Sequence, residues 1–230
     1  MKSAFFTGLF LLFCLSGCRS LPDLIPLSAS RYRPARCDIP FVTENRQFIH
    51  AISSTLPGGG HSLVTGITTV FPDKRSIHVV IMTLEGLVLF EGVIEKDRID
   101  IRRSVPPFSS KQFATGLMHD VRLVFLKPAG LPVMIGSSGR HGFVCRYRNP
   151  DESVIDVTVT GKNDWNLILY GPDLHIKRRV TARSDNSSGT DSGKTAFSRI
   201  GLIADGIFEY RLDLRLIRQT PFADRINPVN

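Results

Sequence analysis

The apolar positions of the chain form one short unbroken run, two stretches with helical spacing and a long series of short apolar segments. The unbroken run covers Ala4 to Leu15 and follows the basic residue Lys2. It is shorter than the roughly 20 residues that a transmembrane helix needs, and a basic residue before such a run is typical of a signal peptide. The pattern therefore predicts an exported protein whose first residues are removed.

Two segments have the spacing of amphipathic helices, in which apolar residues recur every three to four positions. The first is predicted over Glu44 to Leu56, before a glycine-rich turn. The second is predicted over Ser109 to Lys127, with Ser109 or Ser110 as its N-cap and Pro128 after its end. The apolar positions are Phe48, Ile49, Ile52 and Leu56 in the first segment and Phe113, Leu117, Val121 and Val124 in the second.

Most of the remaining chain has the pattern of strands joined by short turns, which predicts an antiparallel meander. Four strands are expected before the second helix and seven after it. The expected strands are Ser62–Phe71, Arg75–Leu84, Leu87–Glu95, Arg98–Arg103, Leu131–Ile135, Gly142–Tyr147, Ser153–Thr160, Asn166–Tyr170, Asp173–Val180, Phe197–Ala204 and Ile207–Ile217. The fold class is therefore mainly β, of the α+β type.

One expected strand, Arg75 to Leu84, is apolar on both of its faces. An antiparallel sheet commonly exposes one face to water, so a strand of this kind needs cover on two sides. Two explanations remain open from the sequence. The strand is either a core strand covered by the protein's own helices, or part of the wall of a site for an apolar ligand.

The pattern divides the chain into four parts. Residues 1–17 are the expected signal peptide and residues 18–40, which are rich in proline and arginine, an expected tether. Residues 41–220 are long enough for a single β domain with its own core, and residues 221–230 form a C-terminal tail.

The end of the first apolar run carries a short motif, Leu15-Ser16-Gly17-Cys18. It resembles the lipobox of bacterial lipoproteins. The resemblance implies cleavage before Cys18, a diacylglycerol on its thiol and acylation of the new amino terminus, which together would anchor the protein stably in a membrane. The next residue is Arg19 rather than the Asp of inner-membrane retention signals. This difference implies lipid anchoring on the periplasmic face of the bacterial outer membrane.

Charge and cysteine content fit an envelope address. The chain has 29 Lys and Arg against 21 Asp and Glu, and only Lys2 of these lies in the signal segment. The excess of basic residues suits anionic headgroups or simply favours solubility, and the address argues against nucleic acid. Cys37 and Cys145 remain after lipidation of Cys18 and loss of Cys14. In an oxidising compartment they either form a disulfide or stay as two buried thiols.

Motifs for chemistry do not emerge from the sequence. The six histidines have no metal-ligand spacing, and the segment 136–139 does not match a nucleophile elbow. His119 and Asp120 are neighbours on the second expected helix, where adjacent side chains point in different directions. The sequence therefore predicts no catalytic residue, no metal and no cofactor, and the protein is expected not to be an enzyme.

The order of elements, with the segments Gly66–Phe71, Met82–Phe90 and Gly116–Pro128, is similar to the lipoprotein carrier and receptor proteins of the Lol pathway, the LolA/LolB-like fold. It more closely resembles an uncharacterised family of bacterial lipoproteins associated with aryl polyene and fatty-acid-type synthesis genes. The resemblance implies an incomplete antiparallel barrel around about two helices, with an apolar hollow for acyl chains. The residues proposed for this hollow are Val80, Met82, Leu87, Leu89, Trp165, Leu167 and Leu169.

These features together predict a lipid-anchored envelope protein that binds or transfers a lipid or the acyl chain of a lipoprotein. The alternative is a structural or assembly lipoprotein that docks another envelope protein through its sheet edge or basic surface. A contiguous apolar cavity would favour the first function, and a solid core with an exposed apolar patch would favour the second.

Overall fold

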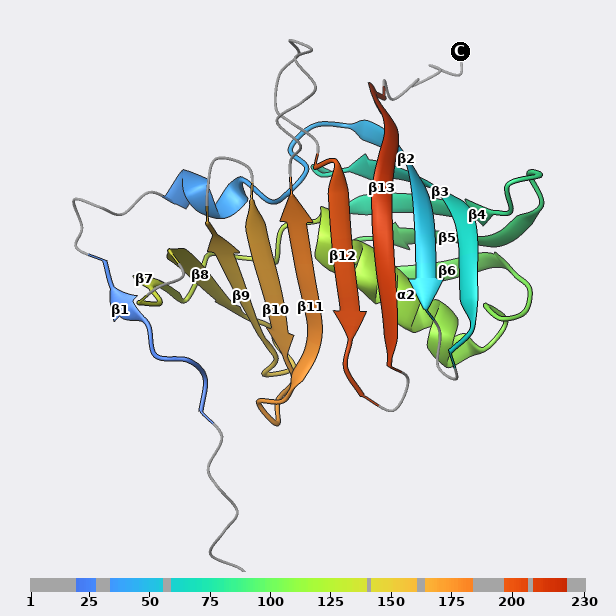
Figure 1. Ribbon diagram of the computed structural model, residues 1–230. Coiled ribbons are helices and arrows are strands. Elements are labelled where there is room, and N and C mark those ends of the chain that lie inside the picture. Colours follow the sequence, from blue (N-terminus) through green and yellow to red (C-terminus); the bar gives the residue numbers. More distant parts are fainter. Residues whose placement is uncertain are drawn as a thin grey trace, which may run out of the picture.

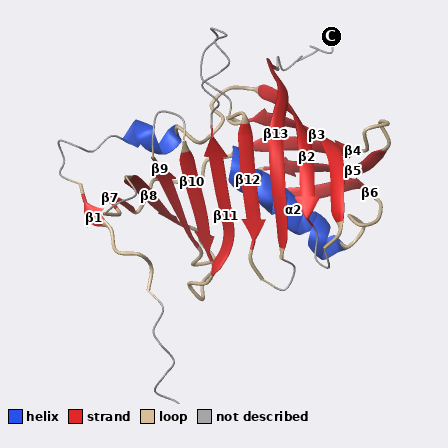
Figure 2. Ribbon diagram, in the orientation of Figure 1, coloured by secondary structure: helices blue, strands red, loops and turns tan. Residues whose placement is uncertain are grey.

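The fold is one curved antiparallel sheet that wraps around a helix (Figures 1 and 2). The computed structural model describes residues 20–27, 34–55, 59–139, 142–160, 164–183, 197–206 and 209–222. The strands lie in the order β1-β7-β8-β9-β10-β11-β12-β13-β2-β3-β4-β5-β6, so the two edge strands, β1 and β6, leave the barrel open. This open, mainly β architecture agrees with the fold class that the sequence predicts.

The strands are β1 (Ile25–Pro26), β2 (Arg46–Thr55), β3 (His61–Phe71), β4 (Ser76–Met82), β5 (Val88–Glu95), β6 (Arg98–Ser104), β7 (Met134–Ser137), β8 (Phe143–Arg148), β9 (Val154–Val159), β10 (Trp165–Tyr170), β11 (Ile176–Arg183), β12 (Arg199–Ala204) and β13 (Tyr210–Pro221). The meander β3–β6 and the series β8–β13 confirm the strands expected from alternation and tight turns. The strand expected at 131–135 is shifted toward the C-terminus, as β7.

The helix expected at Glu44 to Leu56 is wrong, because residues 46–55 form strand β2. Its apolar positions fit both periods, since Phe48, His50 and Ile52 also alternate along one side of a strand. Ten register pairs join β2 to β3, and β13 pairs along the other side. Strands β3 and β13 thereby satisfy the backbone hydrogen bonds of β2 on both sides. These tertiary contacts, of which those with β13 are distant in sequence, override the local helical spacing.

The second expected helix is confirmed as α2 (Lys111–Phe125), and its N-cap is Ser110. The Ser110 hydroxyl accepts a hydrogen bond from the backbone N–H of Phe113 at 3.5 Å. Met118 is fully buried beneath the helix, and a Cβ built at Gly92 of β5 would lie 2.7 Å from its sulfur. A residue without a side chain at position 92 therefore lets α2 approach the sheet closely.

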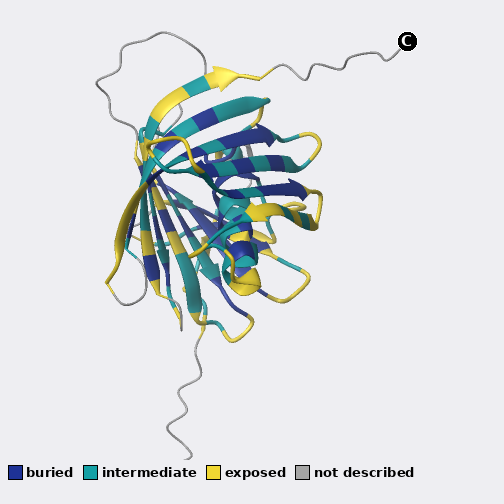
Figure 3. Ribbon diagram, turned by 90° about the vertical axis from the view of Figure 1, so that its right-hand side faces the viewer, coloured by how far each residue is buried: buried dark blue, intermediate teal, exposed yellow. Residues whose placement is uncertain are grey.

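The sequence predicted about two helices inside the barrel, whereas the described residues contain one α-helix and the 3-10 helix η3 (Pro34–Asp38). Figure 3 shows α2 enclosed between the two walls of the curved sheet. We call the side of the sheet that faces α2 the inner face and the opposite side the outer face. None of the described helices is both long enough and apolar enough to cross a bilayer.

Strand β4 shows how the two faces differ. Ile77, Val79 and Ile81 lie on the inner face and are buried in the core. Val80 and Met82 alternate with them on the outer face and are partly exposed. The doubly apolar pattern of this strand thus has one covered side, packed against the core around α2, and one side that faces outward.

Part of the segment expected to be a tether lies against the domain. Strand β1 pairs with β7, and the backbone N–H of Leu27 donates to Ile135. Further along, Cys37 of η3 forms a disulfide with Cys145 of β8. Of the two states left open by the sequence, the structure has the disulfide. It closes a loop with a sequence separation of 108 residues and ties η3 to the core.

Candidate functional site

An open groove runs between the exposed side of α2 and the adjacent ends of β11 and β13. Its volume is about 1130 Å³, the size of a large small-molecule site. The helix contributes Phe113, Gly116 and His119, and the sheet contributes Arg178 and Tyr210. Gly116 leaves its part of the groove open, because a Cβ built there would meet no atom within 4 Å.

Aromatic side chains form a continuous path from the core to the groove. Phe90 of β5 is fully buried, and its ring centroid lies 5.9 Å from that of Phe108. Phe108 lies 5.7 Å from Phe113, which in turn lies 6.1 Å from Tyr210. These separations are within the range of favourable aromatic pairs, and two of the rings, Phe113 and Tyr210, line the groove as an aromatic wall.

A charged network lies at the junction of the helix and the sheet. Asp120 of α2 is buried and accepts a hydrogen bond from Nε of Arg178 at 2.6 Å and another from the hydroxyl of Tyr210. The Arg178 guanidinium also lies over the Tyr210 ring, 5.6 Å from its centroid. Burial raises the pKa of Asp120, and burial together with the Asp120 charge raises the pKa of Tyr210. The network fixes α2 to the sheet beside the groove.

Lys111 and Lys177 line the groove together with one acidic residue, Asp205. Lys111 is exposed at the start of α2, where the helix dipole adds to its charge. Lys177 forms an ion pair with Asp173 at 2.8 Å. His119 is exposed on α2, and partial desolvation together with the nearby Arg122 charge lowers its pKa. An apolar wall beside cationic groups suits an amphiphile with an anionic or polar end.

The structure does not bring the seven residues proposed for the hollow together. Trp165 and Leu167 are buried in the core, and Leu89 and Leu169 are partly buried against it. Val80 and Met82 lie on the outer face, and Leu87 is exposed in the turn between β4 and β5. The groove is lined by other residues. The assignment was wrong as a single cavity, because apolar pattern alone cannot tell which face of β4 meets α2.

The remaining site residue expected from the sequence is the lipidated cysteine. Cys18 lies outside the described residues, so its lipidation stays a prediction. Within the described part of the chain, no three His, Cys, Asp or Glu side chains are arranged to hold a metal ion. Sequence reasoning missed Arg178 and Tyr210 because their partner Asp120 is 58 and 90 positions away. The one usable sign of the groove was Gly116, a small residue within a strongly patterned helix.

Comparison with known proteins identifies the class of fold. The chain has a LolA-like fold: it superposes on a LolA superfamily protein from Nitrosomonas europaea with a TM-score of 0.55, at 11% identity, covering 81% of this chain and 90% of that one. An outer membrane lipoprotein-sorting protein domain from Vibrio parahaemolyticus gives a TM-score of 0.38 at 5% identity, over 81% and 89% of the two chains. That second score is too low to carry an argument. By sequence, the chain matches no family model and no curated protein.

Proposed function

We propose that the protein is a lipid-anchored envelope protein that binds or transfers a lipid or the acyl chain of a lipoprotein. The observation that carries this proposal is the groove along α2, with its aromatic wall and its lysines. An acyl chain would gain affinity from the apolar surface it removes from water, at about 25 cal/mol per Å². The name of the neighbour with a TM-score of 0.55, a LolA superfamily protein, is consistent with such a role.

The cellular location of the protein forms the second part of the proposal. Cleavage before Cys18 and acylation of this residue would hold the domain on the periplasmic face of the outer membrane. The disulfide between Cys37 and Cys145 supports an oxidising compartment such as the periplasm. Mass spectrometry of the amino-terminal peptide tests this part. We expect a lipid-modified Cys18, and an unmodified peptide from the native membrane fraction would contradict it.

Gly116 offers a direct test of the groove. Gly116→Leu places a side chain in the groove, and its Cβ would meet no atom within 4 Å. We expect this variant to bind a fluorescent fatty acid at least roughly tenfold more weakly than the unchanged chain, a loss of about 1.4 kcal/mol. Gly116→Ala is the matched control, because its methyl group occupies little of the groove. It should retain binding.

Two outcomes would decide against acyl binding. One is equal affinity of the Gly116→Leu variant and the unchanged chain for the probe. The other is the absence of co-purifying lipid in native and delipidated preparations alike. The docking function would then be favoured, although the edge strand β6 carries Arg98, Arg102 and Arg103, and charged edges discourage pairing with another strand.

A further inference from the structure

Arginines lie side by side on the outer face of the sheet, away from the groove. Arg183 of β11, Arg199 of β12 and Arg215 of β13 are in direct register, and all three are exposed. We call these three residues the arginine row. Like charges directly opposite each other in a sheet reduce stability, so their alignment calls for a compensating interaction.

The compensation within the described residues is incomplete. Arg199 forms a bidentate ion pair with Asp213, with both carboxylate oxygens 2.9 Å from Nε. The guanidinium groups of Arg183 and Arg215 have no hydrogen bond or ion pair to any residue that the structure describes. Two of the three cations are therefore available for an anion outside the fold.

An apolar strip adjoins the arginine row on the same outer face. Register pairs place Ile49, Ile67 and Val80 side by side across β2, β3 and β4, and Met82 lies one row away. All four side chains are partly exposed. Arg218 pairs with Ile49 at the β13 end of the strip. The outer face thus carries apolar side chains next to a concentration of positive charge.

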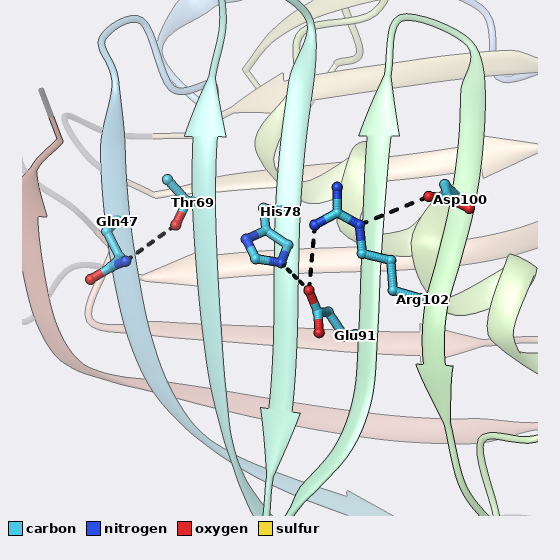
Figure 4. Close-up of polar contacts among 6 residues, drawn as sticks. All are labelled: Gln47, Thr69, His78, Glu91, Asp100 and Arg102. Carbon is cyan, nitrogen blue, oxygen red and sulfur yellow. Dashed lines mark hydrogen bonds and ion pairs between the residues drawn. The ribbon is translucent and has the colours of Figure 1, made fainter. Parts of the chain in front are cut away.

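Polar side chains border the strip on its other side, as Figure 4 shows. His78 Nε2 lies 3.0 Å from Oε1 of Glu91, and Nη1 of Arg102 lies 3.5 Å from the same oxygen. Glu91 is the register partner of Val80. Glu91 thus has two partners at the border of the strip, and Nε of Arg102 also lies 3.8 Å from a carboxylate oxygen of Asp100.

The amino-terminal segment reaches the same outer face at the other end of the sheet. Arg146 of β8 and Asp156 of β9 point outward yet are largely buried, and their Nε and Oδ1 atoms are 2.7 Å apart. Nη2 of Arg146 also donates to the backbone carbonyl of Pro22 at 2.9 Å. Gly136 has no room for a side chain there, since its Cβ would lie 2.9 Å from that of Leu24.

We infer that the outer face of the sheet docks on an anionic membrane surface. The arginine row would bind headgroup phosphates, for which guanidinium groups have a matching bidentate geometry, and the apolar strip would rest at the interface. The docked segment 20–26 would bring the anchor to this face, because only Arg19 separates Ser20 from Cys18. The groove along α2 would then open away from the membrane. The part of this inference that concerns the lipid anchor rests on the proposed function, whereas headgroup binding by the outer face does not.

Vesicle sedimentation tests this docking without the anchor. The mature chain, which begins at residue 18 and carries Cys18→Ser, has neither the apolar signal segment nor a lipidated residue, so membrane binding cannot come from either of them. We expect it to sediment with phosphatidylcholine vesicles that contain phosphatidylglycerol, and not with phosphatidylcholine alone. Binding should weaken as salt is added, since exposed charges are screened. Adding Arg183→Gln and Arg215→Gln should weaken binding roughly tenfold or more, from about 1 kcal/mol for each arginine near the surface.

Controls separate this surface from net charge. Arg122→Gln with Lys127→Gln removes the same charge from the α2 side and should retain vesicle binding. Met82→Gln should weaken the binding that remains at high salt. Circular dichroism checks that each variant is folded.

The proposal of membrane docking is overturned if the unanchored chain binds neither kind of vesicle. That result is expected if the outer face binds an acidic protein instead of a membrane. The proposal is also overturned if both vesicles bind equally, or if the arginine variant binds like its parent. Fatty-acid binding without vesicle binding would refute the docking face alone, and the reverse result would refute the groove function alone.

Discussion

Asp120 of α2 and Arg178 of β11 form an ion pair in which Oδ1 and Nε are 2.6 Å apart. The exposed fraction of the Asp120 side chain is 5% and that of Arg178 is 22%, so the pair is largely shielded from water. Tyr210 of β13 donates its hydroxyl to the same carboxylate. One side chain of the helix therefore joins two strands of the sheet, right beside the groove, and the shape of the groove depends on it.

Asp120→Asn is expected to lower the free energy of unfolding by about 3 kcal/mol, because it leaves the Arg178 guanidinium shielded without a counter-charge. Urea unfolding followed by circular dichroism measures the change. Asp97→Asn is the control, since it breaks an exposed ion pair with Arg122 and should not shift the midpoint. The double variant Asp120→Leu, Arg178→Met should be less destabilised than Asp120→Asn. Equal losses in D120N and D97N would contradict the structural role of the pair.

His50 is expected to make the fold sensitive to acid. Its ring is buried beside Phe48 and Phe125, with centroids 6.0 Å away in each case, and burial lowers its pKa from 6.5 to about 4. The unfolded chain therefore takes up a proton near pH 6.5 that the folded chain refuses until about pH 4. The contribution of the neutral His50 to the free energy of unfolding is complete above pH 6.5. It falls by about 3 kcal/mol as the pH drops to 4.

Urea titrations at several pH values compare the unchanged chain with His50→Phe, which keeps a ring in the same packing. The variant should lose less stability between pH 6.5 and pH 4, by about 3 kcal/mol. Parallel pH profiles for the two chains would show that His50 does not carry the effect.

The local sequence pattern was sufficient to predict those elements for which apolar spacing, caps and turns all indicate the same structure. The helix at 111–125 has an apolar stripe, the N-cap Ser110 and a proline after its end, and the strands β3 to β6 alternate between tight turns. Residues 46–55 carry apolar side chains that fit a helix and a strand equally well. Their strand structure was decided by β3 and β13, and the β13 partner lies more than 150 positions later in the sequence.

The site depended on similar long-range placement. Val79 and Val80 are chemically alike, and only the position of α2 makes one a core residue and the other an outer-face residue. The same holds for Arg178, which is one of several arginines in β11 and β13 and is distinguished only by its contact with Asp120. The apolar pattern left a core strand and a ligand wall open, and only the family resemblance implied a hollow. The residues around such a hollow are set by how the sheet curls.

Loss of the disulfide between Cys37 and Cys145 is expected to cost about 4 to 5 kcal/mol, because the bond constrains a loop of about a hundred residues in the unfolded chain. Cys37→Ala with Cys145→Ala should show this loss in urea unfolding under oxidising conditions. Under reducing conditions, the unchanged chain should approach the variant. If reduction leaves the midpoint of the unchanged chain in place, the bond does not stabilise the fold as expected.

Two glycines at the helix are expected to respond oppositely to alanine. Gly116 lies inside α2 with open space around it, so Gly116→Ala should stabilise the protein by up to about 1 kcal/mol through helix propensity. At Gly92 the new methyl group would lie 2.7 Å from the buried sulfur of Met118, with Phe90 at 3.1 Å. Gly92→Ala should therefore destabilise the protein by about 1 to 3 kcal/mol through overpacking. Thermal unfolding of both variants measures the contrast, and Gly92→Ala with Met118→Ala should be less destabilised than the sum of the two single variants, since the smaller side chain makes room. Additive losses would mean that the methyl group and Met118 do not meet, and that α2 lies further from β5 than the structure places it.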